Sequence, residues 1–500
     1  MRNSNRTLFL AAATILVALP AAAASCDSLK SVKIDHVTID SAELIKAGEY
    51  KAPPGGRGGP PDLSDLPQFC RITATSRPTA DSDIKIEVWL PTNTWNGKFK
   101  ADGNGGWTGS ISASTLADGV RRGYAQAMTD TGHEGGSASF AMNHPEKLID
   151  FGYRSIYEMA VTGQMLTEEF YESPIRYSYF NGCSAGGRQA LQAANMYPEL
   201  FDGVVAGSPG AYWTGRALQS VWIGQASHAS ETSMIPSEKF PAIHAAVLKA
   251  CDTIDGAEDG IIDDPRNCHF DPGMLECEGA DMNDCLTPAQ IATARKIYAD
   301  VTNPRTGTVY FPGDEPGSEL GWRTMAGANP FGPGLDLFRY LVYNDPDWDY
   351  KTFDFDKGAE AALDADRPAD VFRADLSDFY KKGGKVVQYH GWADPQIAPR
   401  SSVMFYDTQV RHSDLATVRD SHRLFMVPGM AHCGGGEGTS QFDMIHALEQ
   451  WVEDGQAPDS VPATRESDGR TRPLCAYPEV AKYKGTGSVD QAENFSCQAP

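Results

Sequence analysis

The sequence predicts an α/β fold with a mainly parallel β-sheet that is covered by helices on both faces. Short apolar segments typical of buried strands alternate with longer amphipathic segments typical of helices, and this alternation occurs twice in the chain. Strands that alternate with helices usually form a parallel sheet with a helix layer on each side. Between the two alternating regions, residues 208–365 are rich in Pro, Gly and Asp and contain four of the ten cysteines, so we expect an inserted domain there.

The chain begins with the features of an export signal. Arg2 and Arg6 precede the apolar run TLFLAAATILVALP, and four alanines end before Ser25, so we predict a signal peptide over residues 1–24. The alternatives are a membrane anchor, because the apolar run approaches the length that spans a bilayer, and a lipid-modified Cys26. No later segment is apolar enough to span a membrane, so we expect a secreted or periplasmic protein.

Composition limits the possible partners. The chain has 500 residues and a formal net charge of −23. Phosphate backbones are bound by clustered Lys and Arg side chains, so this charge argues against a nucleic-acid partner. The length suits about three domains, or one large fold with an insertion.

The ten cysteines, an even number in an exported chain, favour disulfide bonds over free thiols or zinc ligands. Neighbours in the sequence suggest the pairs Cys26–Cys70, Cys251–Cys268, Cys277–Cys285 and Cys475–Cys497. Cys183 and Cys433 remain, far apart in the chain, and each adjoins a candidate catalytic residue. Each of these two thiols could be a rival nucleophile, a metal ligand or half of a covalent bridge.

The strands and helices of the first alternating region can be assigned in order. The segment DIKIEVWLP has the period of a strand with one buried face, and it follows a Pro- and Gly-rich loop at residues 52–61 whose role we do not assign. A glycine-rich loop, DGNGGWTG, precedes the short strand expected in GYAQAMTDTG. Apolar side chains at helical spacing predict a long helix over residues 151–171, and YSYFNG is expected to form the next buried strand.

The turn GCSAG at residues 182–186 matches G-x-S-x-G, the nucleophile elbow of α/β-hydrolases, and it lies between that strand and a helix expected over residues 185–196. Ser184 is therefore the candidate nucleophile, and the alternative is an ordinary strand–helix turn. The tetrahedral intermediate of ester hydrolysis carries an oxyanion that needs N–H donors. We expect these to be the amides of Ala185 and of Gly106 in the glycine-rich loop, with Gly105 as the alternative to Gly106.

A serine nucleophile needs a base, and the base needs an acid that fixes its tautomer. In this fold class the chain order is Ser, acid, His. After FDGVVAGSP, the next expected strands are KVVQY, which leads to Asp394, and RLFMVP, which leads to His432 in a Gly-rich loop. We assign Asp394 as the acid and His432 as the base. His390, His446 and Asp420 compete with them, but they lie at less suitable positions.

The inserted block contains an acidic loop, CDTIDGAEDGIIDDP, before a helix expected in TPAQIATARKIYA. The loop does not have the alternating spacing of an EF-hand. Carboxylates on a Gly-containing loop that is held by Cys251 and Cys268 suit a hard cation, and backbone carbonyls favour calcium over magnesium. The alternative is a solvated turn. The expected calcium ligands are Asp252, Asp255 and Asp259 with the carbonyls of Ala257 and Ile261.

These motifs together resemble the tannase and feruloyl esterase family, which also includes bacterial mono(2-hydroxyethyl) terephthalate hydrolases. The resemblance runs from about Cys70 to the C-terminus and rests on FCRITA, WLPTNTWNGKF, GNGGWTGSI, SYFNGCSAGGRQAL, DGAEDGIIDDP, HGWADP and PGMAHCGGG. It implies an α/β-hydrolase core with a large inserted lid. It also implies a triad of Ser184, Asp394 and His432, a bond between Cys183 and Cys433, and a lid calcium site at the five positions above.

The resemblance therefore predicts an exported serine esterase that hydrolyses esters of aromatic acids, such as feruloyl and other hydroxycinnamate esters or gallates, through an acyl-enzyme. The core would consist of residues 25–207 and 366–500, and the lid of residues 208–365 would set specificity. One alternative is a general carboxylesterase that acts on aliphatic esters. Another is a catalytically silent, calcium-dependent binding protein, against which the intact Ser, Asp, His and glycine loop argue.

Overall fold

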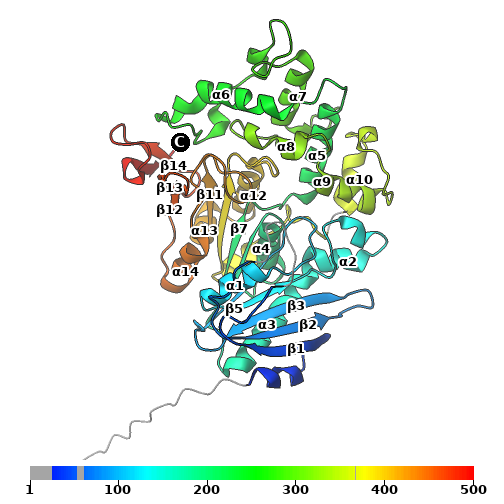
Figure 1. Ribbon diagram of the computed structural model, residues 1–500, viewed down its shortest axis with the longest axis vertical. Helices are drawn as coiled ribbons and strands as arrows, with labels where there is room; N and C mark the ends of the chain where they lie inside the picture. Colours follow the sequence, from blue (N-terminus) through cyan, green and yellow to red (C-terminus); the bar gives the residue numbers. More distant parts are fainter. Residues whose placement is uncertain (1–24, 53–60, 366–367) are drawn as a thin grey trace, which may run out of the picture.

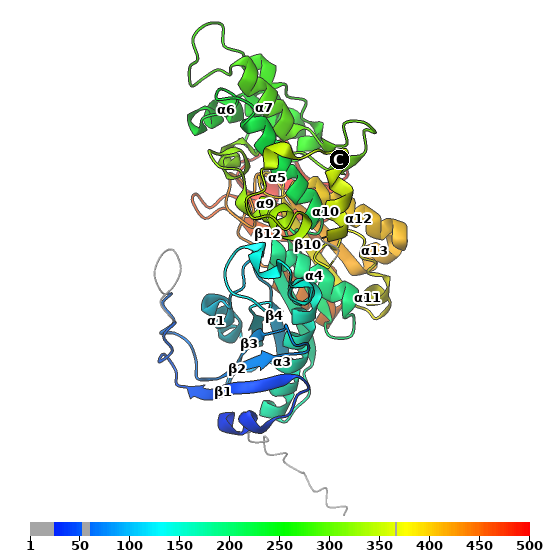
Figure 2. The same ribbon diagram turned by 90° about the vertical axis from the view of Figure 1, so that its right-hand side faces the viewer.

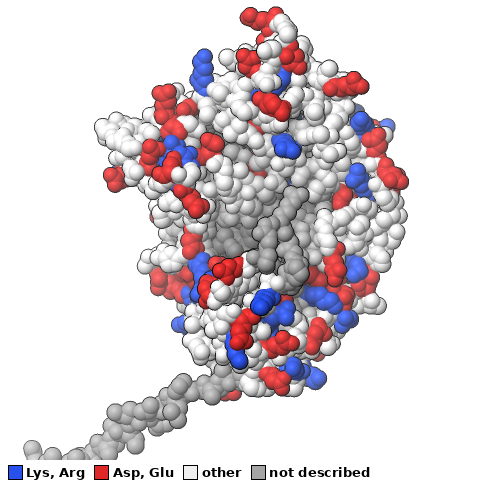
Figure 3. Space-filling model, viewed as in Figure 1, with Lys and Arg blue, Asp and Glu red and all other residues white. Residues whose placement is uncertain are grey.

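A computed structural model describes residues 25–52, 61–365 and 368–500. The expected signal peptide and most of the Pro- and Gly-rich loop at residues 52–61 lie outside these ranges. Across the described ranges, no helix combines the length and the apolar character that are needed to cross a bilayer. On the face in Figure 3, acidic and basic side chains stand beside one another mainly toward the edges and the lower part, and few of them lie at the centre among the described residues.

The centre of the molecule is a nine-stranded sheet with the order β1-β2-β3-β5-β4-β6-β7-β10-β11 (Figure 1). The strands from β5 to β11 in this order run parallel, and β1, β2 and β3 extend the sheet in antiparallel fashion. The mainly parallel sheet is thereby confirmed. The strands are β1 Val37–Ile45, β2 Phe69–Ser76, β3 Ile84–Pro91, β4 Lys98–Asp102, β5 Ala125–Thr129, β6 Tyr177–Cys183, β7 Gly203–Gly207, β10 Lys385–Gly391 and β11 His422–Val427.

Helices cover both faces of the sheet because apolar side chains line both faces of its central strands. On one face the helices α3, α4, α11, α12 and α13 share a buried core with the strands, and on the other face α1 and α14 do so. Their bounds are α1 Ala113–Arg121, α3 Ser155–Tyr171, α4 Ala185–Met196, α11 Ser377–Lys381, α12 Arg400–His412, α13 Leu415–Ser421 and α14 Met444–Asp454.

The expected helix over residues 151–171 begins differently in the structure. The short helix α2, Pro145–Ile149, leads through a wider helical turn at Asp150–Arg154 into α3. Pro145 suits the first turn of α2 because the N–H that proline lacks would have no partner there. The chain is therefore already helical before residue 151.

Residues 208–365, which we call the insertion, add no strand to the nine-stranded sheet. Figures 1 and 2 show α6 and α7 of this segment at one end of the molecule and β1 at the other. Its function as a lid stays a prediction. Its elements are α5 Trp213–Ser227, α6 Phe240–Cys251, α7 Pro288–Tyr298, β8 Val301–Thr302, β9 Val309–Phe311, α8 Arg323–Ala326, α9 Gly332–Asp336 and α10 Gly358–Ala365.

Two antiparallel hairpins, which the sequence did not predict, follow α14. The hairpins are β12 Ser460–Thr464 with β13 Thr471–Cys475, and β14 Val480–Tyr483 with β15 Phe495–Gln498. Pro462 of β12 faces Pro473 of β13. Prolines weaken the sequence signal of a strand because they cannot donate to the ladder.

Candidate active site

Ser184 forms the turn between β6, which ends at Cys183, and α4, which begins at Ala185. Its backbone has φ 64° and ψ −122°, a conformation that costs a non-glycine residue on the order of 1–3 kcal/mol. The amide of Ser184 donates to the carbonyl of Gly207 at 2.9 Å, and its own carbonyl accepts from the amide of Gly210 at 3.1 Å. These bonds hold the strained turn, as expected for a nucleophile elbow.

The glycines of the motif are required because other backbone segments pass close to the turn. A Cβ atom on Gly182 would lie 2.4 Å from the carbonyl carbon of Gly186, and one on Gly186 would lie 3.0 Å from the carbonyl oxygen of Asn104. Residue 104 belongs to the glycine-rich loop after β4. The motif therefore brings that loop next to the candidate nucleophile.

Asp394 lies after β10 and His432 lies after β11, at the carboxyl ends of neighbouring parallel strands. His432 Nδ1 is 2.7 Å from Asp394 Oδ2. The other oxygen, Oδ1, accepts the amides of Gln396 at 2.8 Å and of Ile397 at 3.1 Å. With Nδ1–H bonded to the carboxylate, a neutral His432 ring presents Nε2 as a proton acceptor, the tautomer that a general base needs.

Asp394 is completely buried. Burial by itself raises the pKa of this carboxyl, but the charge of His432 and hydrogen bonds from His390 and His432 outweigh it and hold the pKa well below its usual range. Asp394 is therefore ionised at neutral pH and can stabilise a protonated His432.

His390, a competing base in the sequence, instead supports the acid. Its Nε2 lies 3.1 Å from Asp394 Oδ2 and 3.0 Å from the carbonyl of Ile397, and its Nδ1 lies 2.7 Å from Ser402 Oγ. Both partners of Nε2 are acceptors, so Nε2 carries a hydrogen, and Nδ1 of the neutral ring accepts from Ser402. No sequence pattern predicts this role, because it depends on how the chain turns after β10.

The other two competitors lie elsewhere. His446, on the surface of α14, is exposed and lies 3.9 Å from Glu449. Asp420 precedes β11, and its carbonyl accepts a hydrogen bond from Lys385 Nζ at 2.8 Å. Neither residue contacts Asp394 or His432 through any hydrogen bond of the described residues.

The disulfide bond between Cys183 and Cys433 joins the residue before Ser184 to the residue after His432. The two Cα atoms are 6.0 Å apart across a sequence separation of 250 residues. A nucleophile and its base must lie within hydrogen-bond reach, and this bond brings their backbones together. All ten cysteines are bonded, in the five pairs that the sequence suggested.

The candidate oxyanion donors come from α4 and from the loop after β4. Ala185 is the first residue of α4, so its N–H has no acceptor within the helix. The loop is fixed to α4 by two hydrogen bonds. The backbone N–H of Asn104 donates to Gln189 Oε1 at 2.8 Å, and Gln189 Nε2 donates to Asn104 Oδ1 at 3.2 Å. Cβ atoms on Gly105 or Gly106 would meet nothing within 4 Å, so both glycines border open space.

An aromatic wall stands beside this loop. The Trp107 ring is buried. Its centre lies 5.0 Å from the centre of the Trp213 ring of α5 and 4.8 Å from that of the Phe151 ring. Trp107 Nε1 donates to the carbonyl of Pro333 at 2.8 Å. Trp107 and Trp213 share one apolar cluster with Ala185, so the insertion contributes aromatic surface next to the elbow.

The acidic loop expected to bind calcium follows α6, and the Cys251–Cys268 bond closes it. Its aspartates accept backbone amides of the loop itself. Asp252 accepts Gly260 N at 3.1 Å, Asp255 accepts Ala257 N at 2.8 Å, and Asp259 accepts Ile261 N at 3.1 Å. In the part of the chain that the structure describes, no three Asp, Glu, His or Cys side chains gather closely enough to hold a metal.

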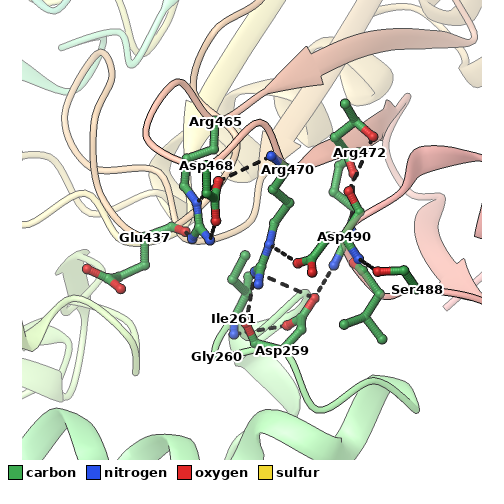
Figure 4. A network of polar contacts seen from close by, with 12 residues as sticks. Asp259, Gly260, Ile261, Glu437, Arg465, Asp468, Arg470, Arg472, Ser488 and Asp490 are labelled. Atoms are coloured by element: carbon green, nitrogen blue, oxygen red, sulfur yellow. Dashed lines mark hydrogen bonds and ion pairs between the residues drawn. The ribbon is translucent and has the colours of Figure 1, made fainter.

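The chemistry of these donors nevertheless suits a hard cation. Burial raises the pKa of Asp255 to about 6, and the charges of Asp259 and Asp252 contribute to the shift. Burial also raises the pKa of Asp259. Figure 4 shows two arginines on the other side of Asp259: Arg472 pairs with its carboxylate, and Arg470 Nη1 donates to its carbonyl at 2.8 Å. The positive charges of Arg470 and Arg472 therefore already lie next to Asp259 of the loop.

Comparisons with known proteins identify the family. A family profile described as tannase and feruloyl esterase matches residues 70–498. An uncharacterized esterase of Xanthomonas campestris pv. campestris is 37% identical over 98% of this chain and 93% of its own length. A probable feruloyl esterase B-2 of Aspergillus fumigatus is 32% identical over 98% of both chains.

Solved structures share the fold. The crystal structure of feruloyl esterase B from Aspergillus oryzae superposes with a TM-score of 0.88 at 30% identity, covering 95% of this chain and 99% of that chain. The tannin acyl hydrolase from Aspergillus niger superposes with a TM-score of 0.78 at 21% identity, covering 95% of each chain. The α/β-hydrolase fold expected from the sequence is confirmed by these similarities.

Proposed function

Because this chain belongs to the tannase and feruloyl esterase family, we propose that it is an exported serine esterase that cleaves aromatic-acid esters through an acyl-enzyme. The family makes it a carboxylic ester hydrolase that acts on aromatic esters. The catalytic residues, the covalent intermediate, export and calcium are our additions. The observation that most supports the proposed catalytic residues is the 2.7 Å contact between His432 and Asp394, linked through the Cys183–Cys433 bond to the strained Ser184.

In the proposed reaction, Ser184 Oγ attacks the ester carbonyl carbon while His432 Nε2 takes the hydroxyl proton. The carbonyl π electrons move to oxygen, and the amides of Ala185 and Gly106 stabilise the resulting oxyanion. When the tetrahedral intermediate collapses, the C–O bond to the alcohol breaks and His432 gives its proton to the leaving oxygen. Water then attacks the carbonyl carbon of the acyl-enzyme while His432 takes its proton. The bond to Ser184 Oγ breaks, His432 returns the proton to Ser184, and the acid is released. Asp394 stays ionised throughout and orients His432.

Substitution of the nucleophile tests this reaction. Ser184→Ala is expected to lower kcat for methyl ferulate by roughly 10⁴- to 10⁶-fold, because the covalent route is lost. A fluorophosphonate probe should label the wild-type protein on Ser184 and leave the variant unlabelled. Ser467→Ala, at an exposed turn, is the matched control and should behave as wild type. Labelling at another residue, or a fully active Ser184→Ala, would rule the proposal out.

Export is supported by the leader and by five disulfide bonds, which persist in oxidising compartments. Mass spectrometry of the protein recovered from its native host should find Ser25 as the first residue. A mature chain that retains residues 1–24 would instead favour the membrane anchor.

Calcium is proposed as a structural ion of the acidic loop. The side chains of Asp252, Asp255 and Asp259 and the carbonyls of Ala257 and Ile261 would hold it. Bound there, the ion would offset the mutual repulsion of carboxylates whose pKa values burial raises. The five residues lie outside the triad, so we assign them no catalytic step.

A general carboxylesterase that acts on aliphatic esters is the competing enzyme. The aromatic rings of Trp107 and Trp213 next to the elbow support our preference for an aromatic acyl group in the substrate. Comparison of kcat/KM for methyl ferulate, methyl gallate and p-nitrophenyl butyrate separates the two, and faster turnover of the butyrate would favour the general enzyme.

A further inference from the structure

His133 is a buried histidine in the loop after β5, and it is 7% exposed. Its Nε2 atom lies 2.7 Å from the carbonyl oxygen of Trp107. Because a carbonyl only accepts, Nε2 carries the hydrogen, and Nδ1 of the neutral ring can accept from the hydroxyl of Thr131, 3.3 Å away. Burial lowers the pKa of His133, so the ring is neutral at neutral pH. His133 is therefore a buried donor that the proposed reaction does not use.

The carbonyl that His133 binds belongs to a tight turn at the candidate oxyanion donor. The amide of Thr108 donates to the carbonyl of Gly105 at 2.9 Å, so residues 105–108 form a turn with Gly106 and Trp107 at its centre. Gly106 has φ 53°, a left-handed conformation that glycine adopts without strain. Among the described residues no acceptor is bonded to the amide of Gly106, which leaves this N–H available to an oxyanion.

The loop that carries His133 is itself held in place. Asp130 Oδ1 accepts the amide of Gly132 at 2.8 Å. Thr131 has φ 61°, which is strained for a β-branched residue and persists only where the surroundings enforce it. The His133 ring stacks on the Phe140 ring, with 3.6 Å between the ring centres. The imidazole is therefore a fixed support for the turn at residues 105–108.

A second contact joins the same two loops. The amide of Gly109 donates to the carbonyl of Gly135 at 2.7 Å. A Cβ atom on Gly109 would clash with the carbonyl oxygen of His133, so the two backbones pass close to one another. The bond from His133 to Trp107 lies nearer to Gly106 in the chain than this backbone contact does. We therefore expect the imidazole to determine how the Gly106 amide points.

We propose that His133 is a positioning residue for the oxyanion hole, which orients the amide of Gly106 by binding the carbonyl of Trp107. His133 itself would touch neither the substrate nor Ser184. An oxyanion donor accelerates the reaction only when it is aimed at the position where negative charge develops. Loss of this support should therefore weaken binding of the transition state more than binding of the substrate. The inference rests on the proposed function and adds a residue to it.

Two inhibitors distinguish the transition state from the ground state. Ser184 Oγ would form a bond to the carbonyl carbon of trifluoroacetophenone, with the hydroxyl proton passing to His432 and the carbonyl π electrons forming an oxyanion in the proposed hole. Benzoate has the same ring and forms no such adduct. The measured quantity is the ratio of the Ki of benzoate to the Ki of trifluoroacetophenone, together with kcat and KM for methyl ferulate.

The variants His133→Met and His133→Gln have side chains of similar length, and only Gln retains a donor. We expect His133→Met to lower the Ki ratio and kcat by roughly 10- to 100-fold with little change in KM, because the oxyanion donor is misplaced. His133→Gln should recover part of both, since its amide can donate to the Trp107 carbonyl. The control is His422→Met, at another buried histidine, which bonds to Tyr380 and Gln388. It should leave the Ki ratio unchanged.

Thr131→Val gives a readout that keeps the buried ring. It removes the hydroxyl that faces His133 Nδ1, and the Ki ratio should fall by roughly 2- to 10-fold. An unchanged ratio in His133→Met, or in Thr131→Val if His133→Met does not fold, would overturn the inference. Equal losses in His133→Met and His133→Gln would also overturn it. If wild type bound trifluoroacetophenone no more tightly than Ser184→Ala, the proposed function itself would fail, which is a different outcome.

Discussion

Asp394 is the residue at which the candidate site is assembled. Its two oxygens accept hydrogen bonds from two histidines and two amides, which keeps a fully buried carboxylate ionised. The candidate triad could be proposed from the sequence because Ser184, Asp394 and His432 follow strands in a fixed order. The role of His390 could not, since its ring turns toward Asp394 only when the loop after β10 has folded.

We expect His390 to be a positioning residue. His390→Leu removes one donor from Asp394 Oδ2, and kcat should fall by roughly 10- to 100-fold because the acid loses its fixed orientation. The pKa of Asp394 is depressed in the folded protein. The stability that its ionised form contributes is therefore present at and above the usual pKa range of a carboxyl, and it is lost as the pH falls through the folded-state pKa. Loss of a donor raises that pKa, so the loss of stability on acidification should begin at a higher pH in His390→Leu, which urea unfolding at several pH values measures.

Two further variants distinguish positioning from simple loss of a buried ring. His390→Gln can still donate to Asp394 and should recover part of kcat. His422→Leu removes another fully buried histidine, which bonds to Tyr380 and Gln388 instead of Asp394. It should lower stability without a comparable fall in kcat. An unchanged kcat in His390→Leu would contradict the positioning role.

At the scale of elements, the strands and helices next to the motifs could be predicted and the edges of the fold could not. The helix α4 matches the expected residues 185–196 because the elbow fixes its start. The strand β1 has only one fully buried residue among nine, so its apolar signal is weak. The first hairpin after α14, β12 with β13, was missed because Pro462 and Pro473 weaken the sequence signal of its strands.

The acidic loop after α6 is the element whose stability should depend on calcium. Chelation is expected to lower Tm by roughly 5 °C, if calcium is otherwise held near 100 times its Kd. Added calcium should restore Tm, and added magnesium should restore it less, since magnesium demands stricter geometry. The measurement is a thermal melt of the whole protein with and without chelator.

Variants connect this effect to the loop. In Asp255→Asn the response to chelator should be absent or much reduced. Asp271→Asn removes an exposed acid of the insertion that pairs with Arg295 at 2.9 Å, and it should respond as wild type. Identical melts with and without chelator in the wild-type protein would leave the loop without a calcium site.

At the scale of the whole molecule, the insertion is fastened to the rest of the protein at separate points. Trp107 of the core bonds to Pro333 of the insertion, and Arg472 and Arg470 of the hairpin formed by β12 and β13 bond to Asp259. Figure 4 shows that the same network continues through Asp468 and Arg465 to the backbone of Glu437, near His432 in the chain. The hairpin of β12 and β13 therefore connects the acidic loop to the loop that carries the candidate base.

Arg472→Met tests this connection. Arg472 and Asp259 have side chains only 6% and 5% exposed. Loss of Arg472 leaves the buried carboxylate with the more distant Arg470, 4.0 Å away, and should cost about 1.5–3 kcal/mol in the free energy of unfolding. The double variant with Asp259→Asn should recover much of that loss. Arg295→Met, which lies outside this network and whose partner Asp271 is 58% exposed, is the control and should change the free energy of unfolding little. Urea unfolding in the presence of chelator measures all three.

The bond between Cys183 and Cys433 should matter more than the other bonds for both stability and activity. Replacing both cysteines with alanine should cost up to about 5 kcal/mol, because the bond closes a very long loop, and it should also lower kcat. The same change at Cys277 and Cys285, which are only 8 residues apart, is the control and should cost about 2 kcal/mol without lowering kcat. Full activity of the Cys183→Ala/Cys433→Ala protein at a temperature where it stays folded would show that the bond does not position the triad.

The long reach of that bond also determines when the enzyme matures. The elbow leaves the ribosome about 250 residues before the cysteine that completes the site, an interval of roughly 10 to 50 seconds of synthesis. During that time Cys183 is an unpaired thiol, and Cys251, Cys268, Cys277 and Cys285 emerge before its native partner. Correct oxidation therefore depends on the later thiols pairing with one another first, and a cell that oxidises the chain in order of emergence would produce inactive isomers.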